Sequence, residues 1–288
     1  MIALDTAWLA VNPLPQPAGV TDKNARGRLL VAGGSLRVPG ALMLSGEAAF
    51  RAGAGKVQLA TVAPAALPLG IAMPEAAVIA LPANADGELG AEAADGVAAM
   101  IARCDALAIG PGMGAGAEPQ PILAALLERA PQVPLLLDAA MLRAAGSQGK
   151  RLATHAGPVV LTPHPAEMTA LMGGEAGEAC AERAEAAAAR YQATVVLKST
   201  ETWIATDGQP TLHYPGGGPG LATGGSGDVL AGIIGGLLAR GASPQIAAAW
   251  GVWLHGESGR RCAERSGRIG LLARELLASI PRLMDSAA

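Results

Sequence analysis

The sequence is short of aromatic side chains, of cysteines and of excess charge. Aromatic residues make up 2% of the 288 residues, so the core must consist mainly of Ala, Leu, Val and Ile. The three cysteines, Cys104, Cys180 and Cys262, lie far apart and form no CxxC pair, which favours reduced thiols in a cytoplasmic protein over a disulfide framework. The net charge of −3 provides no general attraction to nucleic acid or to anionic membranes.

Long apolar runs and metal-ligand motifs are also missing from the chain. It has no stretch of about 18 uncharged apolar residues, and no basic segment leads into an apolar stretch at its N-terminus. The sequence therefore predicts neither a membrane-spanning helix nor a signal peptide. The four histidines show no HExxH or comparable spacing, so we expect no structural zinc and can name no direct protein ligand for a metal.

Short apolar runs alternate with helix-like stretches along most of the chain. This alternation is typical of a mostly parallel sheet covered by helices on both faces. No repeat, linker or charge run marks a further boundary, so we expect one α/β domain over residues 27–288, preceded by a short helix and a proline-rich arm over residues 1–26. The expected strands lie within 27–34, 56–62, 76–81, 106–112, 134–139, 158–164 and 194–200, and the clearest helices within 41–55, 121–130 and 179–192.

Glycines and polar residues gather where the expected strands end. Glycines follow the strands at 33–34 and 110–114, Asp138 follows PLLL, Thr162-Pro163-His164 follows PVVL, and Lys198-Ser199 follows TVVL. In parallel sheets ligands bind at the carboxyl ends of the strands, in the loops before the next helix. The sequence therefore predicts a ligand site at this edge of the sheet.

Residues 216–228, GGGPGLATGGSGD, combine seven glycines with a single charged side chain, Asp228. Apolar pairs that recur every four residues over 229–238 predict a helix directly after this loop. Because the first amides of a helix lack internal partners and carry partial positive charge, the loop at 224–227 and those amides can cup an anion such as phosphate. The alternative is a tight turn with Asp228 as an ordinary helix cap.

The position of Asp228 also predicts its chemistry. A carboxylate at a helix N-terminus is stabilised as the anion, so we expect the pKa of Asp228 to be lowered. Such a weak base suits phosphoryl transfer, in which the base need only orient a hydroxyl. It suits the abstraction of a carbon-bound proton poorly.

Other nucleotide motifs fit less well. The chain contains no GxxxxGK[ST] loop, and the strand 56–62 ends in Thr61 and Val62 instead of the acid that a dinucleotide-binding Rossmann site expects. GPGMGAG at 110–116 is a weak GxGxG signal. Together with residues 224–227 it predicts two glycine-lined faces with a ligand between them.

These motifs together identify a family. The chain resembles the ADP/ATP-dependent NAD(P)H-hydrate dehydratases of the ribokinase-like superfamily, over about residues 27–280. The resemblance implies a ribokinase-like three-layer α/β/α fold with a mostly parallel central sheet. The matching segments are GRLLVAGGS…PGA (27–41), FRAGAGKVQLAT (50–61), MPE (73–75), IGPGMG (109–114), LLLDA (135–139), LTPHPAEM (161–168), VVLKSTET (195–202), GLATGGSGDVLAGIIGGLLARG (220–241) and GVWLHGESG (251–259).

The resemblance implies a metabolite-repair lyase. Such enzymes act on the S epimer of hydrated NADH or NADPH (NADHX or NADPHX), in which water has added across the nicotinamide ring. They phosphorylate the ring hydroxyl from ADP or ATP and then eliminate phosphate to regenerate NAD(P)H. Mg²⁺ would accompany the nucleotide phosphates.

The resemblance also implies roles for individual positions. Asp228 would be catalytic, orienting the ring hydroxyl. Contacts to the hydrated dinucleotide would come from Ala41, Gly114, His164 and Asp228. The nucleotide and its phosphates would be bound by Lys198, Ser199, Thr200, Glu201, Thr202, Gly224, Gly225, Ser226 and Gly227.

Four departures from the family pattern affect nucleotide preference and rate more than the reaction class. Ser199 replaces the glycine of a Lys-Gly pair, Gly218-Pro219-Gly220 replaces Asn-Pro-Gly, and Ala140 replaces the second acid of Asp-Ala-Asp. Near the C-terminus, Arg274-Glu275-Leu276 replaces the usual Asp-Leu pair.

The remaining polar and aromatic candidates have simpler interpretations. His164 lies between two prolines at a strand end, which indicates contact with a ligand. His255 is instead expected to have a structural role on a packed helix. His155 and His213 have no partner motif in the sequence, and we expect them to be surface residues. Trp250 and Trp253, three apart, are expected in the core or an interface.

Two alternatives to the dehydratase stay open at this stage. A ribokinase-like kinase acting on a pyrimidine or thiazole alcohol would use the same glycine loop and Asp228, and a non-catalytic nucleotide-binding protein would not need that acid. We expect a homotetramer, as in bacterial relatives. Only about 25 residues precede the first expected strand, so the NAD(P)HX epimerase that many relatives carry is expected to be a separate chain.

Overall fold

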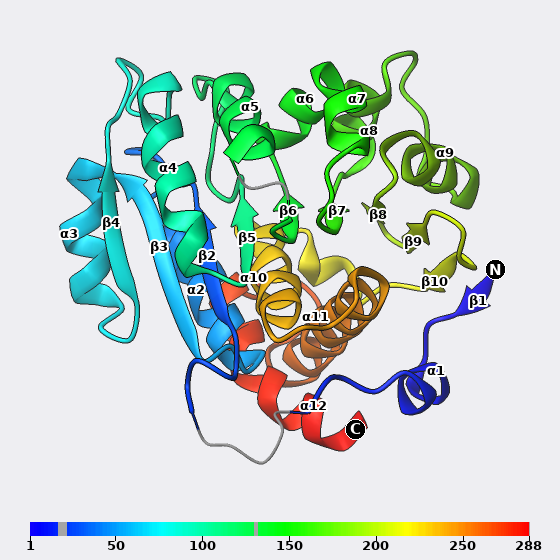
Figure 1. Ribbon diagram of the computed structural model, residues 1–288. Coiled ribbons are helices and arrows are strands. Elements are labelled where there is room, and N and C mark those ends of the chain that lie inside the picture. The colour runs from blue at the N-terminus through cyan, green and yellow to red at the C-terminus, as the bar shows by residue number, and fades with distance from the viewer. Residues whose placement is uncertain (17–21, 130–131, 288) are drawn as a thin grey trace.

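A single sheet forms the centre of the computed structural model, which describes residues 1–16, 22–129 and 132–287 (Figure 1). Its ten strands lie in the order β1-β10-β9-β8-β7-β6-β5-β2-β3-β4. Strand β9 runs antiparallel to both of its neighbours, and the other pairs are parallel. The strands are β1 (Ile2–Ala3), β2 (Arg28–Ala32), β3 (Lys56–Val62), β4 (Ala77–Leu81), β5 (Ala106–Ile109), β6 (Leu135–Leu137), β7 (Val159–Leu161), β8 (Thr194–Lys198), β9 (Thr202–Thr206) and β10 (Leu212–Tyr214).

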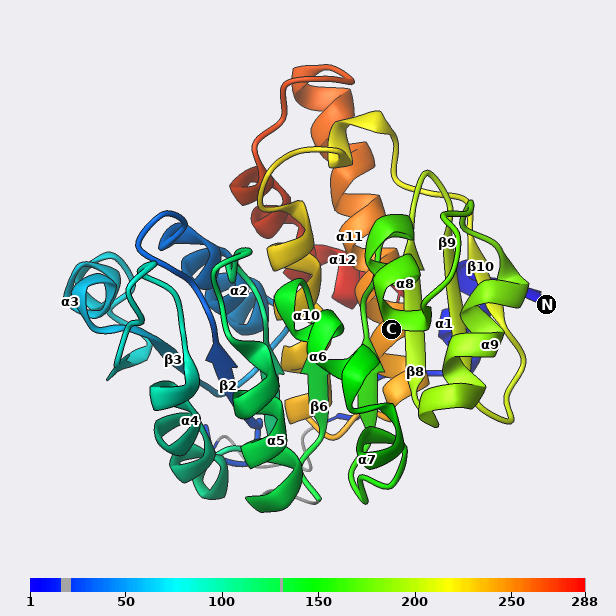
Figure 2. The ribbon, with the colours of Figure 1, turned by 90° about the horizontal axis from the view of Figure 1, so that it is seen from above.

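Helices cover both faces of the sheet (Figures 1 and 2). One layer contains α2 (Gly40–Arg51), α10 (Ser226–Ala239), α11 (Pro244–Ser266) and α12 (Ile280–Ala287), with α1 (Thr6–Val11) at its edge. The other layer contains α4 (Ala94–Met100), α5 (Pro119–Arg129), α6 (Ala140–Ser147), α7 (Gly149–Ala153), α8 (Pro165–Met172) and α9 (Ala181–Tyr191). Helix α3 (Ala63–Ala72) packs beside the edge strand β4. The arrangement confirms the predicted three-layer α/β/α fold.

The central strands β2, β5, β6 and β7 are mostly apolar because both of their faces are buried. In β2, Leu29 and Val31 pack with α2, α10 and α11, whereas Leu30 and Ala32 join the core beneath α4, α5 and α6. All four side chains have no exposed surface. Side chains alternate between the faces of a strand, so a strand buried on both sides reads as a continuous apolar run.

Three strands were not expected from the sequence. The strands β9 and β10 extend the sheet beyond β8, and the two-residue β1 pairs with β10. The N-terminal segment therefore joins the main sheet, and the Trp250 indole donates a hydrogen bond of 2.8 Å to the Asn12 carbonyl. Residues 17–21 of the expected arm lie outside the described residues, and the division of the chain at residue 26 stays a prediction.

The helix predicted after the glycine loop is α10, and its glycines allow close packing. A Cβ at Gly232 would lie 2.1 Å from the Ser45 carbonyl oxygen of α2, so no larger residue fits there. One turn earlier, the Ser45 hydroxyl donates to the Asp228 carbonyl over 2.9 Å. Packing of α10 on α2 thus fixes the position of Asp228.

Within the described residues, no helix is long and apolar enough to cross a membrane.

Candidate active site

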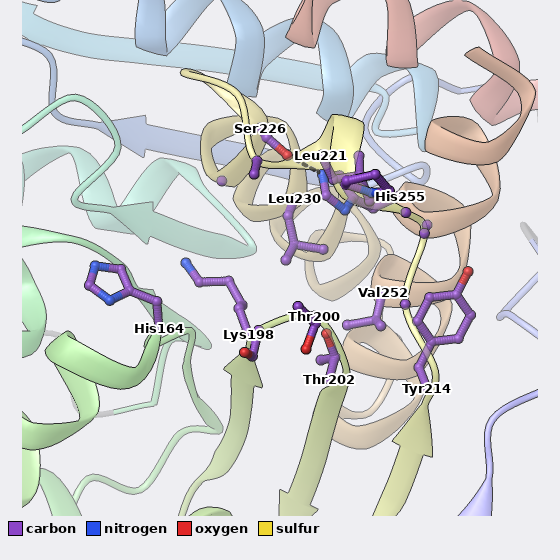
Figure 3. Close-up of a pocket in the computed structure, with 18 of the residues that line it drawn as sticks. His164, Lys198, Thr200, Thr202, Tyr214, Leu221, Ser226, Leu230, Val252 and His255 are labelled. Carbon is purple, nitrogen blue, oxygen red and sulfur yellow. Dashed lines mark hydrogen bonds between the residues drawn. The ribbon is translucent and has the colours of Figure 1, made fainter. Parts of the chain in front are cut away.

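A cavity of about 750 Å³ opens at the edge of the sheet where β8 and β10 end and β9 begins (Figure 3). Lys198, Thr202 and Tyr214 are neighbours there, because the register pairs Thr202 with each of the other two. The glycine-rich loop, the start of α10 and the middle of α11 form the opposite side. The cavity therefore lies where the sequence predicted a ligand site.

Helix α10 begins at this cavity without a side-chain cap. Gly225 precedes the helix with φ +87°, a left-handed conformation that favours glycine, and no side chain caps the helix. Asp228 lies in the first turn and is not the cap. The alternative in which Asp228 is an ordinary helix cap is therefore wrong, and the first amides of α10 can receive an anion.

The electrostatics of Asp228 differ from the prediction. Burial raises the pKa of Asp228 to about 6, and the nearby Asp138 charge acts in the same direction. The Lys198 charge and a hydrogen bond from the Gly112 backbone lower this pKa, but they do not compensate for burial. The prediction of a lowered pKa is wrong, because it counted only the helix terminus and not the surfaces that cover the carboxylate.

Lys198 forms an ion pair below the start of α10. Its amine donates to an Asp138 carboxylate oxygen over 3.0 Å, and the Thr162 hydroxyl donates to the same oxygen over 2.6 Å. Burial is the largest influence on Lys198 and acts to lower its pKa, but Asp138, Glu167 and Asp228 together raise the pKa above its usual value. The amine is therefore a cation in a site with three carboxylates.

Asp138 and Thr162 were noted at strand ends, but the sequence did not assign them to the site. Asp138 is 4% exposed and follows β6, and Thr162 is 1% exposed and follows β7. Their only signal in the sequence was the shared position after an apolar run. The contact with Lys198 spans 60 residues of chain, and no local pattern encodes it.

His164 lies at the rim of two cavities. It is the N-cap of α8, where its Nδ1 accepts a hydrogen bond from the Ala166 amide over 3.2 Å and Glu167 accepts one from the His164 amide. The side chain is 52% exposed, and its other ring nitrogen, Nε2, lies 3.4 Å from a Glu167 carboxylate oxygen. A ligand at this rim would therefore meet His164 and Glu167 together. The second cavity, of about 320 Å³, includes Gly114 and Arg143 in its lining.

The other residues expected to contact the dinucleotide lie on the side facing Gly112. Ala41 is buried at the start of α2, and a Cβ on Gly112 would lie 2.6 Å from the Ala41 Cβ. The Gly114 amide donates to Glu88 over 3.0 Å. The Gly112 backbone forms a hydrogen bond with Asp228, so the loop 110–114 and the start of α10 meet at this carboxylate. The large cavity is lined by Gly227 but not by residues 110–114, so a ligand held between two glycine-lined faces stays a prediction.

The expected nucleotide residues are partly gathered in the large cavity. Its lining includes Lys198, Ser199, Thr200, Thr202, Ser226 and Gly227 but not Glu201, Gly224 or Gly225. Glu201 instead accepts a hydrogen bond from His213 over 2.8 Å. Gly224 and Gly225 lead into the helix and shape its start.

The histidines outside the rim have partners. His213 stacks on Trp203 with ring centroids 4.2 Å apart, and His155 forms a 2.9 Å hydrogen bond with the Val133 carbonyl. Both are half-buried, so neither is the simple surface residue that the sequence predicted. Trp250 and Trp253 are buried, as expected.

The fold is that of the ribokinase-like proteins. A ribokinase-like superfamily protein from Enterococcus faecalis superposes with a TM-score of 0.84 at 30% identity, covering 100% of this chain and 96% of that chain. The ADP/ATP-dependent NAD(P)H-hydrate dehydratase from Bacillus subtilis, co-crystallized with ATP/Mg²⁺, superposes with a TM-score of 0.82 at 29% identity, covering 100% of this chain and 99% of that chain.

Comparison of sequences shows to which family within the ribokinase-like proteins the chain belongs. The NAD(P)H-hydrate dehydratase family profile matches residues 29–282. An ADP-dependent (S)-NAD(P)H-hydrate dehydratase from Xanthomonas campestris is 46% identical, over 97% of this chain and 94% of that protein. A bifunctional NAD(P)H-hydrate repair enzyme Nnr from Moorella thermoacetica is 39% identical, and this chain spans 53% of its length. The chain belongs to the NAD(P)H-hydrate dehydratase family.

Proposed function

We propose that this protein dehydrates (S)-NADHX and (S)-NADPHX to NADH and NADPH with ADP as the phosphoryl donor. The observation that carries the proposal is a half-buried carboxylate, Asp228, beside the uncapped start of α10 and the Lys198 cation. The 46% identity to an ADP-dependent enzyme over nearly the full length of both chains supports ADP over ATP. Ala41, Gly114 and His164 would contact the hydrated dinucleotide on one side of Asp228.

In the first step the ring hydroxyl attacks the terminal phosphorus of the nucleotide. Asp228 accepts the hydroxyl proton, the new O–P bond forms, and the bond from phosphorus to the leaving phosphate oxygen breaks, which leaves AMP when ADP is the donor. The first amides of α10 and the Lys198 amine stabilise the charge on the transferring phosphoryl group. Asp228 then lies beside the oxygen that it deprotonated.

In the second step the phosphate leaves from the ring. The ring C–O bond breaks with its electron pair on the phosphate, and the neighbouring ring carbon passes its proton to water as the C=C bond forms. Phosphate is a far better leaving group than hydroxide, which explains why the reaction consumes a nucleotide. The same amides and Lys198 hold the departing phosphate.

Magnesium fits this site as a partner of the phosphates. Among residues 1–16, 22–129 and 132–287, no three His, Cys, Asp or Glu side chains form a metal cluster. Mg²⁺ commonly uses one or two carboxylates together with substrate phosphates and water. Apart from Asp228, which the reaction uses as the base, the carboxylates whose charges act on Lys198 are Asp138 and Glu167. These two side chains are suited to that role, and the ion would add charge neutralisation on the phosphates.

The raised pKa of Asp228 predicts the acid side of the rate profile. With a pKa of about 6, Asp228 is a carboxylate above that pH and gains a proton below it. We expect kcat/KM, which reports the pKa of the free enzyme, to fall about tenfold for each pH unit below about 6. Stopped assays from about pH 5 to about pH 8 measure this. A rate that stays level down to pH 5 would show that Asp228 does not carry the proton.

Gly227 offers a test of the phosphate cup that leaves the fold intact. A Cβ there would meet only the Lys198 amine, 3.8 Å away. We expect Gly227→Ala to raise the KM for ADP about tenfold or more, because the methyl group occupies phosphate space, while helix stability is kept or improved. Gly70→Ala, in α3 with only Val78 nearby, is the matched control. Equal kinetics for both variants would place the phosphate elsewhere.

The function itself is tested by absorbance. Purified protein is mixed with hydrated NADH or NADPH, Mg²⁺ and either ADP or ATP, and the return of the reduced nicotinamide band is followed. We expect a nucleotide-dependent return that is faster with ADP. Phosphate transfer to a pyrimidine or thiazole alcohol without any return would favour the kinase alternative.

The proposal also covers the oligomeric state, the location in the cell and a partner enzyme. The expected homotetramer is tested by light scattering on the purified protein, and a cytoplasmic location by fractionation. Relatives that are bifunctional repair enzymes support a functional pairing with an NAD(P)HX epimerase. Addition of such an epimerase should let the protein consume both epimers of the substrate.

A further inference from the structure

Ser226 and His255 form a hydrogen-bonded pair on the wall of the large cavity (Figure 3). Ser226 is the first residue of α10 and is 5% exposed. His255 lies in the middle of α11, and its Nε2 is 2.9 Å from the Ser226 Oγ. The pair thus joins the helix start that would hold phosphate to the helix behind it.

The imidazole of His255 is neutral in this setting. Burial lowers the pKa of His255 to about 4; a hydrogen bond with the Ser226 backbone opposes this, and the Lys198 charge adds to it. A neutral imidazole carries a single N–H. The Nε2 atom therefore either donates to Ser226 or accepts from it, and the group bound in the cavity decides between them.

An anion at the start of α10 selects one arrangement. If the Ser226 hydroxyl donates to His255, its lone pairs face the phosphoryl oxygens and repel them. If His255 donates through Nε2–H, the Ser226 hydrogen is free to point to a phosphoryl oxygen. Only the second arrangement adds a donor to the amides of α10.

We propose that His255 is a positioning residue whose Nε2–H holds the Ser226 hydroxyl as a hydrogen-bond donor to the transferring phosphoryl group. This role rests on the proposed dehydratase function and adds a second residue pair to its phosphate site. His255 does not touch the reacting atoms, and it acts through Ser226. Packing gives a weaker reason for a histidine here, because its neighbours Leu254 and Gly256 in α11 are buried and a leucine would fill the space without a buried polar atom.

A double-mutant cycle separates positioning from packing. The variants are Ser226→Ala, His255→Leu, the combination of both, and His255→Gln, whose amide nitrogen has about the reach of Nε2. Each is assayed for kcat and for the KM of ADP in the dehydratase reaction, with thermal unfolding and ADP calorimetry as checks of folding and ground-state binding. Coupled residues give effects that do not add.

The expected pattern is specific. Ser226→Ala lowers kcat about 10- to 100-fold, the range for loss of a hydrogen bond to a charged group, and His255→Leu lowers it about tenfold. His255→Leu has no further effect once Ser226 is Ala, and His255→Gln stays within about threefold of the wild type because it restores the donor.

Two results would overturn the positioning role. In the first, His255→Leu lowers kcat by the same factor with and without the Ser226 hydroxyl. In the second, folded His255→Gln is as slow as His255→Leu. An inactive wild-type protein in the same series would instead overturn the proposed function, so the two failures are distinguishable.

Discussion

Replacing Asp228 by Asn is expected to abolish turnover while ADP binding stays within about threefold of the wild type. The amide keeps the shape of the carboxylate but cannot accept the hydroxyl proton, and loss of a general base costs up to about 10⁴-fold in rate. The carboxylate lies in the first turn of α10, so its loss removes no cap from that helix. Single-turnover kinetics and calorimetry with ADP measure the two quantities.

The same substitution is expected to stabilise the protein near neutral pH. The pKa of Asp228 is raised from 3.8 to about 6 by burial and by Asp138, so its contribution to stability is complete below about pH 4 and is lost as the pH rises through 6. Asp228→Asn removes this penalty and should raise the free energy of unfolding by about 2 to 3 kcal/mol above pH 7. Below pH 4 the gain should vanish.

Asp105 supplies a control of opposite sign. A hydrogen bond from the Arg28 side chain is the main reason that the pKa of Asp105 is lowered, so Asp105→Asn should destabilise the protein at neutral pH. If Asp228→Asn instead destabilises the protein and weakens ADP binding as much as it slows turnover, Asp228 supports the loop and is not the base.

Replacing Lys198 by Met is expected to cause the second large effect. The amine is the cation nearest to Gly227 and forms the ion pair with Asp138. Its loss removes charge stabilisation from the transferring phosphoryl group, which should lower kcat by about 10²-fold or more. It also leaves Asp138 buried without a counter-charge, which costs about 3 to 5 kcal/mol of stability when such a pair is broken.

Lys198→Met should also move the pH profile. The Lys198 charge lowers the pKa of Asp228, so without it the acid limb of the rate profile should shift to higher pH. The double variant Lys198→Met with Asp138→Asn separates the two roles, because it removes both charges. We expect recovered stability with activity still lost; recovery of activity as well would show that Lys198 serves only to neutralise Asp138.

The parts of the fold that are buried on both sides could be predicted from the sequence. Strands such as β5 and β6 read as uninterrupted apolar runs because helices cover both of their faces. The missed strands lie at one end of the sheet, where β9 and β10 run antiparallel to each other and β1 consists of only two residues. Their short and mixed sequences, such as TWIAT and LHY, carry too little periodicity to predict a strand.

The site could be predicted wherever a single segment encodes it. The glycine loop and Asp228 are adjacent in the sequence, so the start of α10 and its acid were both identified. The pKa of Asp228 could not be predicted, because it depends on burial in the folded chain and on the Asp138 charge and the Gly112 hydrogen bond from other loops. The contacts between Lys198 and Asp138, and between Ser226 and His255, likewise exist only after the strands and helices have packed together.

The central claim is that the ring hydroxyl of the substrate is phosphorylated before it leaves. The most direct test uses hydrated NADPH whose ring hydroxyl carries the heavy isotope of oxygen, turned over with ADP and Mg²⁺, with the released phosphate analysed by mass spectrometry. The account requires one heavy oxygen in each inorganic phosphate and one AMP for each NADPH formed. Heavy oxygen found in water, with unlabelled phosphate, would show that the hydroxyl leaves without being phosphorylated and would contradict the mechanism.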